Sequence, residues 1–382
     1  MAADTTVTRF DSTQTGAPTL NNTAGSLIAV LDACLVDGFG LKAVDSVVIT
    51  DGVGVATIST GHAAIEGSVV LFAGATGTLS ALNGRRKVTS VGTYSVTFDA
   101  SDLANGTATG TITMKQAGAG WSKAFSGTNL AAYKSANVQA SGCLLRVDDT
   151  TTTYASVRGC EAMTDINTYS GVIPTTTQQA TNCFLKSSSA TAKPWRIFAN
   201  DRVVYLAIAP DASYPTAFFL YGFGDAVSRK AGDAWRFFLI AASSTSISFS
   251  SNYNPLPVTT GSFHSKYMAR SYSALGSAVA VTQTWFGSAA QSGTSGNGGS
   301  LFPNPADNAI DYTPIVLLEG TGYRGALPGV FATPQDIQAG VVDSTILKDI
   351  PGLSGALIYQ QNSLTATTRG GLFFDLTGPW SV

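Results

Sequence analysis

The sequence predicts a mostly-β protein with a small β-barrel or sandwich module, a larger antiparallel β-sandwich (jelly-roll-like) domain and one short N-terminal helix. Between Val53 and Met114, apolar residues alternate with Thr and Ser, and Gly, Asn or Asp interrupts them every eight to twelve residues. This period of two is typical of short, half-buried strands joined by tight turns. The composition agrees, because 40 Gly, and 21 Asp against three Glu, favour turns over exposed helices.

Residues 1–44 are predicted to form an N-terminal arm and the short helix. Met1 to Asn22 is polar and rich in Thr, which indicates an extended arm. From Ala24 to Val36, apolar residues recur at steps of three and four, as on one face of a helix. We expect Ser26 to cap the start of this helix and Gly38 to end it.

Residues 45–116 are predicted to form the small β-module. Gly61-His62 indicates a tight turn, with His62 capping or packing it, and Asn83-Gly84 indicates a type I′ hairpin turn. The basic run Arg85-Arg86-Lys87 follows at the start of a strand. We expect a solvated or edge-protecting face there, with phosphate or nucleic-acid binding as the alternative.

Residues 117–382 are predicted to form the larger β-sandwich, after a Gly/Ala linker at 116–120. Its clearest hairpin joins Trp195–Ala199 to Arg202–Ile208, and Phe218–Phe223 is expected to pair with Trp235–Ala242. Gly224-Asp225 and Gly232-Asp233 are interpreted as turns, and 288–308 as a flexible exposed loop. Further strands are expected at 313–318, 356–360 and 372–376.

Aromatic residues are concentrated in this larger domain. A row in alternating strands is typical of a sandwich core, and sugar binding is the alternative. The row comprises Trp195, Phe198, Tyr205, Tyr214, Phe218, Phe219, Tyr221, Phe223, Trp235, Phe237 and Phe238.

Composition and charge argue against several classes of partner. Charged residues make up 12% of the chain, the net charge is −2, and there is no long basic or acidic block, so neither nucleic acid nor an anionic membrane surface is expected as a partner. We expect no membrane insertion, because the longest apolar run, near 27–36, is short and interrupted by Asp32. Met1 to Gln14 has the polar character of a segment without a secretory signal.

The motifs of catalysis and metal binding are absent from the sequence. There is no Gly-x-Ser-x-Gly, no His-Glu-x-x-His and no phosphate-binding loop, and His62 and His264 lie far apart. Asp148-Asp149 could ligate calcium, although paired Asp residues at a strand end more often form turns. We therefore expect a non-enzymatic protein with no catalytic, cofactor-binding or metal-binding residues and no cofactor.

The four cysteines, Cys34, Cys143, Cys160 and Cys183, match no zinc spacing. We interpret them as reduced, buried thiols of a protein made in a cytoplasm. A pairing of Cys143 with Cys160 remains an alternative.

The order of motifs in the module resembles a small β-module that recurs in structural proteins of tailed bacteriophages. The order is an alternating strand, Gly61-His62, Gly-x-Val-Val at 67–70, Leu-Asn-Gly at 82–84, Val-Thr-Ser-Val at 88–91 and Thr-Phe at 97–98. The opening at 15–40 and the C-terminal stretch Arg-Gly-x-Leu-Pro-Gly-Val at 324–330, with Trp380, look like the same group.

This resemblance implies a structural subunit of a tailed-phage virion, made in the bacterial cytoplasm and located in the particle. Its expected place is the tail tip, baseplate or fibre-attachment region, with head or collar decoration as the alternative. Its partners would be other copies of itself and other virion proteins. A third interpretation is a receptor- or glycan-binding module that uses the aromatic row on a host surface glycan.

Three residues in the C-terminal stretch are candidates for subunit contacts: Arg324, Tyr323 and Trp380. Arg324 is flanked by Gly322 and Gly325. Its guanidinium either holds a carboxylate across a subunit contact or makes an internal salt bridge in a turn.

Overall fold

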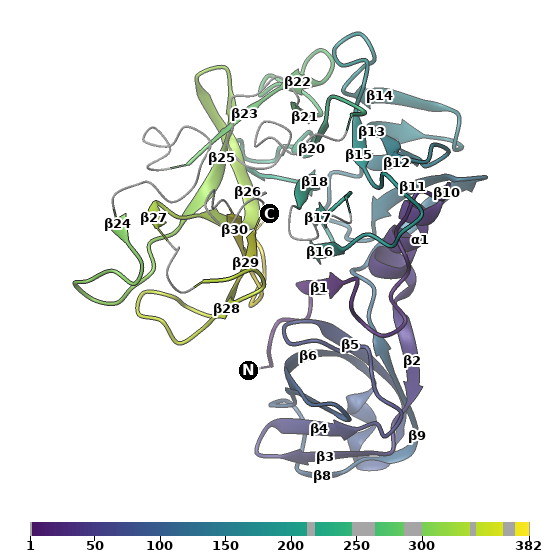
Figure 1. The fold of residues 1–382 in the computed structure, drawn as a ribbon, viewed down its shortest axis with the longest axis vertical. Helices are drawn as coiled ribbons and strands as arrows, with labels where there is room; N and C mark the ends of the chain where they lie inside the picture. Colours follow the sequence, from purple (N-terminus) through teal and green to yellow (C-terminus); the bar gives the residue numbers. More distant parts are fainter. Residues whose placement is uncertain are drawn as a thin grey trace.

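A computed structural model describes residues 2–211, 218–246, 264–285, 300–336, 341–361 and 371–381. Among these residues, strands form sheets of thirteen, eight, seven and two strands, and two short helical segments accompany them, one near the N-terminus and one between two strands of the eight-stranded sheet. The predicted mostly-β class is confirmed. Figure 1 shows a small lower lobe that contains β2 to β9 and a larger upper part that contains the other sheets.

The lower lobe is an antiparallel sheet with the strand order β2-β9-β5-β6-β7-β4-β3-β8. Its side chains alternate as predicted, because Val47 and Ile49 are buried while Val48 and Thr50 face outward. We call this lobe the β-module. Its strands are β2 (Phe39–Ala43), β3 (Ser46–Thr50), β4 (Val53–Thr57), β5 (Val69–Thr76), β6 (Gly84–Val91), β7 (Ser95–Asp99), β8 (Gly106–Thr107) and β9 (Thr109–Gln116).

The predicted type I′ turn at Asn83-Gly84 is wrong. A 3₁₀ helix, η2 (Gly77–Leu82), connects β5 to β6, and Asn83 has φ −57°, outside the left-handed region that such a turn requires. The Asn83 side-chain amide instead accepts from the Ala75 N–H at 2.9 Å and donates to the Ala75 carbonyl at 2.8 Å. The Asn83 side chain therefore bonds the backbone groups of Ala75 near the end of β5, where a neighbouring strand would otherwise supply the partner.

The predicted helix is present as α1 (Ser26–Leu31), which continues into the π-helical turn η1 (Asp32–Asp37). Gly38 ends it with φ 73°, as predicted. The predicted cap is wrong, because Gly25 occupies the cap position and the Ser26 hydroxyl donates to the Asn21 carbonyl. The first helical N–H groups are instead bonded by a carboxylate distant in the sequence, that of Asp149.

The upper part contains two large sheets. The thirteen-stranded sheet has the order β1-β16-β17-β18-β20-β15-β13-β12-β11-β10, with β14, β21 and β22 attached. Its strands are β1 (Thr8–Asp11), β10 (Trp121–Gly127), β11 (Leu130–Ser135), β12 (Leu144–Asp148), β13 (Tyr154–Met163), β14 (Tyr169–Ile173), β15 (Cys183–Leu185), β16 (Trp195–Ala199), β17 (Val203–Ile208), β18 (Phe219–Asp225), β20 (Phe237–Ala242), β21 (His264–Met268) and β22 (Val279–Ala280).

The seven-stranded sheet has the order β23-β25-β26-β30-β29-β28, with β19 attached to β26. Its strands are β19 (Val227–Ser228), β23 (Thr282–Thr284), β25 (Thr313–Glu319), β26 (Gly322–Ala332), β28 (Ile346–Leu347), β29 (Leu357–Gln361) and β30 (Gly371–Asp375). A parallel pair, β24 (Ser300–Leu301) with β27 (Gln335–Asp336), completes the fold. Of the predicted loop at 288–308, residues 288–299 lie outside the described residues.

The two large sheets enclose an aromatic core. Phe198 of the thirteen-stranded sheet stacks on Phe374 of the seven-stranded sheet, with ring centroids 4.2 Å apart. The hairpin β16–β17 and the pair β18–β20 confirm the predicted strands. On its other face, the thirteen-stranded sheet packs against α1.

The core interpretation of the aromatic row is confirmed. Trp235 is half-buried, and Tyr214 lies outside the described residues. Nine other members are buried, so the sugar-binding alternative loses the residues on which it depended: Trp195, Phe198, Tyr205, Phe218, Phe219, Tyr221, Phe223, Phe237 and Phe238.

Candidate functional site

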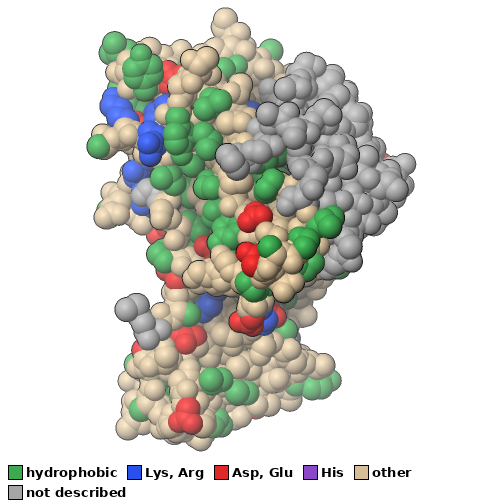
Figure 2. All heavy atoms as spheres, turned by 90° about the vertical axis from the view of Figure 1, so that its left-hand side faces the viewer, with side chains coloured by type: hydrophobic (Ala, Val, Ile, Leu, Met, Phe, Trp, Pro, Cys, Tyr) green, Lys and Arg blue, Asp and Glu red, His purple; other side chains and the backbone are tan. Residues whose placement is uncertain are grey.

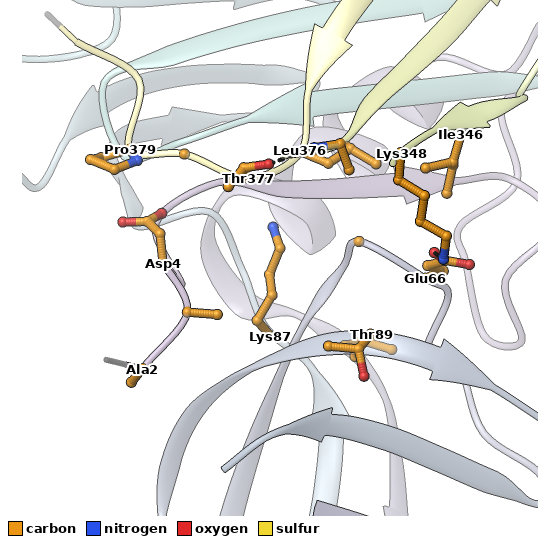
Figure 3. A pocket seen from close by; sticks show the side chains of 15 residues that line it. Ala2, Asp4, Glu66, Lys87, Thr89, Ile346, Lys348, Leu376, Thr377 and Pro379 are labelled. Atoms are coloured by element: carbon orange, nitrogen blue, oxygen red, sulfur yellow. Dashed lines mark hydrogen bonds and ion pairs between the residues drawn. The ribbon is translucent and has the colours of Figure 1, made fainter. Parts of the chain in front are cut away.

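A pocket of about 630 Å³ lies where the β-module meets the seven-stranded sheet. We call it the junction pocket. Three separate parts of the chain line it: the N-terminal arm at 2–4, the module at 66–67 and 87–89, and C-terminal segments at 346–348, 356 and 376–379. Figure 3 shows Asp4 beside Pro379, with Lys87 directed from the module toward the segment that contains Thr377.

Lys87 is the most chemically distinctive residue of the junction pocket. Its side chain is buried, and its ammonium donates to the Val7 carbonyl at 2.8 Å. Burial lowers the pKa of Lys87 to about 8, and the nearby carboxylates of Asp4 and Asp375 oppose this only in part. The hydrogen bond from its ammonium to the Val7 carbonyl holds the arm against the module.

The expectation of a solvated basic face at Arg85-Arg86-Lys87 is wrong. Arg85 donates to the Thr5 and Gly118 carbonyls, while Arg86 is buried and pairs with Asp102 at 2.6 Å. Carbonyls of the N-terminal arm accept hydrogen bonds from Arg85 and Lys87, while Arg86 bonds within the module. Sequence reasoning missed this role because the acceptors are distant backbone atoms.

At two glycines of the junction pocket, the backbone lies directly against a side chain from another segment. A Cβ added to Gly67 would lie 2.8 Å from Leu376 Cδ1, and one added to Gly378 would lie 2.6 Å from Asp4 Oδ1. Glu66 pairs with Lys348 at 2.9 Å across the joint, as Figure 3 shows. The charged groups at the junction pocket therefore hold chain segments together.

The other predicted polar sites have structural partners. His62 Nε2 lies 2.8 Å from the Gly92 carbonyl, while the His264 side chain lies outside the described residues. Asp149, considered for calcium, is buried and pairs with Lys186. No group of three His, Cys, Asp or Glu side chains suited to a metal ion occurs within the described residues.

The acidic turns and the cysteines give a mixed result. Asp225 is the last residue of β18, so it is not a turn residue, and its carboxylate accepts from the backbone N–H and the hydroxyl of Ser141. Asp233 lies within a turn and accepts from the Trp235 N–H.

All four cysteines are buried and free, as interpreted, and Cys143 and Cys160 are not bonded to each other. None of the described helical segments has the length and apolar character needed to span a membrane.

The three candidates for subunit contacts differ in exposure. Trp380 is buried against Tyr205 in the core, and its indole N–H donates to the Asp375 carbonyl at 3.1 Å. Arg324 is 3% exposed and makes the internal salt bridge, to Asp233 at 2.6 Å. Tyr323, 46% exposed, is the only one of the three with a side chain at the surface of the chain.

The outward side of β3, β4 and β7 is a further candidate surface, which we call the valine face. It consists of Ser46, Val48, Thr50, Val53, Val55, Thr57, Ser95, Thr97 and Asp99, the outward positions of three paired strands. Val48 lies directly opposite Val55, and both are exposed by more than a third. Figure 2 shows the visible side of the module as mostly uncharged, with a few hydrophobic side chains and some acidic ones.

The sequence held a signal for the valine face that we did not use. Residues 46–57 carry valine at outward as well as inward positions of the strands. A strand whose outer face is exposed to water would usually carry polar residues at the outward positions. A sheet face of this kind can form a contact with another protein.

Comparison with known proteins identifies no family. No family model matches the chain, and no curated protein matches it. Among solved structures, the chain is similar to a phage phi92 endosialidase, with 12% identity and a TM-score of 0.18 over 85% of this chain. The chain spans 44% of the length of that endosialidase. A likeness at this TM-score carries no argument about fold or function.

Proposed function

We propose that this chain is a non-enzymatic structural subunit of a tailed-phage virion, which acts through contacts with copies of itself and with other virion proteins. The observation that carries the proposal is the valine face. It presents Val48, Val53 and Val55 to solvent on paired strands, and its single charged residue is Asp99.

The junction supports the same proposal. Strand β1 of the N-terminal arm joins the thirteen-stranded sheet through β16, while Arg85 and Lys87 fasten the neighbouring arm residues to the module. The arm thereby links the module to the larger part of the chain. Such a link suits a structural subunit, in which forces pass between the two parts.

The place within the particle rests on the sequence resemblance alone. That resemblance favours the tail tip, baseplate or fibre-attachment region, with head or collar decoration as the second choice. Immunogold labelling of purified particles separates the two, because label on the capsid would refute the tail assignment.

The assembly role is tested by the mass of the purified chain in solution. We expect a defined multimer by light scattering, and Val48→Glu with Val55→Glu should shift it to monomer because two carboxylates would be desolvated in the contact. Val138→Glu is the matched control, since Val138 is 98% exposed and outside the valine face. The multimer should persist at about 1 M salt, which screens ionic contacts but not apolar ones.

Two results would refute the proposal. One is a stable monomer that is absent from purified particles. The other is a multimer that persists in the double valine variant but dissociates at high salt. Its contact would then be ionic and would lie outside the valine face.

A further inference from the structure

A second pocket, of about 410 Å³, lies beside the turn that joins β25 to β26. We call it the Arg324 pocket. Its side chains come from three parts of the chain that lie close together: Arg229 and Lys230, Tyr272, and Glu319, Tyr323 and Arg324. It lies apart from both the valine face and the junction pocket.

Arg324 is the most buried of these residues, and two of its guanidinium nitrogens lack a hydrogen-bond partner. Its Nη1 donates to Ser228 Oγ at 2.7 Å and pairs with Asp233 at 2.6 Å. Its Nε and Nη2 have no hydrogen-bond partner among the described residues, although the side chain is 1% exposed. Burying a donor without a hydrogen-bond partner costs free energy, so a ligand that accepted hydrogen bonds from these two nitrogens would bind favourably.

The two unmet donors point to a specific partner. Nε and Nη2 form one edge of the planar guanidinium, and that edge can donate two parallel hydrogen bonds to the oxygens of a carboxylate. Glu319 does not fill it: its Oε2 lies 3.5 Å from Arg324 Nε and accepts from the Tyr272 N–H at 2.9 Å. A ligand carboxylate would therefore have to displace Glu319, which forms an ion pair with Arg324 at this edge.

The charges around the pocket favour an anion. Arg229, Lys230 and Arg324 contribute three positive charges, against two negative charges from Glu319 and from Asp233, which pairs with Arg324. Asp233 is already bonded to Ser228 and Arg324. The pocket therefore keeps a positive excess that would attract a carboxylate.

Two exposed rings flank the pocket. Tyr272 is 68% exposed, and Tyr323 is 46% exposed with the Arg229 guanidinium stacked 4.9 Å from its ring centre. Exposed aromatic rings next to a carboxylate-binding edge suit a ligand that combines an acid with a ring bearing hydroxyl groups. We propose that the Arg324 pocket binds an acidic saccharide of the uronic-acid type, with its carboxylate on Arg324 and its ring against the tyrosines.

The test measures the affinity of the full chain for matched small ligands by titration followed by NMR. Glucuronate should bind at least about tenfold more tightly than glucose, which has the same ring without the acid. Acetate, inorganic phosphate and an aspartate-containing dipeptide should each bind more weakly than glucuronate. If any of these three binds as tightly, the saccharide assignment is wrong.

Variants test the geometry. Arg324→Lys can keep the pair with Asp233 but lacks the two-donor edge, so glucuronate affinity should fall about tenfold. Arg86→Lys, at a buried arginine of the β-module, is the matched control and should leave the affinity unchanged. Equal effects of the two variants would overturn the proposal.

Two substitutions at partly exposed positions keep the test decisive if Arg324→Lys does not fold. Glu319→Gln removes a competing carboxylate and should raise glucuronate affinity about threefold, while Tyr272→Ala should lower it. A fall with Glu319→Gln, or no change with Tyr272→Ala, would overturn the proposal. The readout is ligand affinity, so its outcome is independent of whether the chain belongs to a virion.

Discussion

Replacing Asp149 by alanine should destabilise the larger part of the protein more than any surface change, because this carboxylate does two tasks. One oxygen accepts the N–H groups of Leu27 and Ile28 at 2.8 and 3.3 Å and so caps α1 from 122 positions away. The other pairs with the ammonium of Lys186, and both side chains are fully buried.

The magnitude follows from what the substitution leaves behind. Breaking a buried ion pair by removing one partner costs about 3–5 kcal/mol, since the remaining charge stays buried. Loss of a helix cap costs about 1 kcal/mol. Because Lys186 keeps only the Thr23 carbonyl at 2.8 Å, we expect Asp149→Ala to lower the free energy of unfolding by about 4–6 kcal/mol.

Urea unfolding followed by tryptophan fluorescence measures this change, since Trp195 is buried in the affected core. The double variant Asp149→Asn with Lys186→Met provides the control. Its amide oxygen keeps an acceptor for the helix, and it leaves no charge in the core, so its loss should be below about 2 kcal/mol. A loss below about 1 kcal/mol for Asp149→Ala, or a double variant as unstable as the single one, would refute the reasoning.

Three further predictions concern other buried groups. Burial lowers the pKa of Lys87 from its ordinary value near 10.5 to about 8, so the unfolded chain binds this proton more tightly and stability from this group rises with pH between those values. The melting temperature of the wild type, relative to that of Lys87→Met, should therefore rise between about pH 7 and 10. A difference that stays constant over this range would contradict the lowered pKa. Gly329→Ala should cost about 2–4 kcal/mol in chemical denaturation, because the backbone has φ 67° and the new Cβ would lie 2.2 Å from Trp380; a loss below about 1 kcal/mol would show that the indole moves aside. Since burial raises the pKa of the four cysteine thiols, a disulfide reagent should label them only after denaturation, and rapid labelling of the native chain would contradict their burial.

Local patterns in the sequence predicted several features correctly where neighbouring residues decide the structure, although not the turn type at Asn83-Gly84. The hairpin around Asn200 formed as predicted, because its side-chain oxygen accepts the N–H groups of Arg202 and Val203 and shapes the turn. Gly38 ended the helix for the equally local reason that it adopts a positive φ.

Predictions failed where a distant group supplied the partner. The helix takes its cap from Asp149, and Arg85 and Lys87 donate to carbonyls of the N-terminal arm. Neither arrangement leaves a trace in spacing or periodicity. The same holds for Arg324, where the internal bridge to Asp233 depends on a long-range pairing of β19 with β26.

The distribution of charge connects the interior of the protein to the proposed assembly. The chain has few charged residues, 22 basic and 24 acidic, and part of this small number is not at the surface. Nine charged residues are buried within the described part of the chain: Arg86, Lys87, Asp149, Lys186, Lys193, Arg202, Asp225, Asp233 and Arg324.

This burial changes what composition alone would imply. Charges that hold the arm, the helix and the sheet edges in place are unavailable to repel a neighbouring copy, so the surface is poorer in charge than the sequence suggests. Thr, Ser and Val are left outside on β3 and β4, where a neighbour can cover them without desolvating ions. The interior ion pairs and the valine face thus have a common consequence: a chain that is held rigid within and offers little electrostatic resistance to contact.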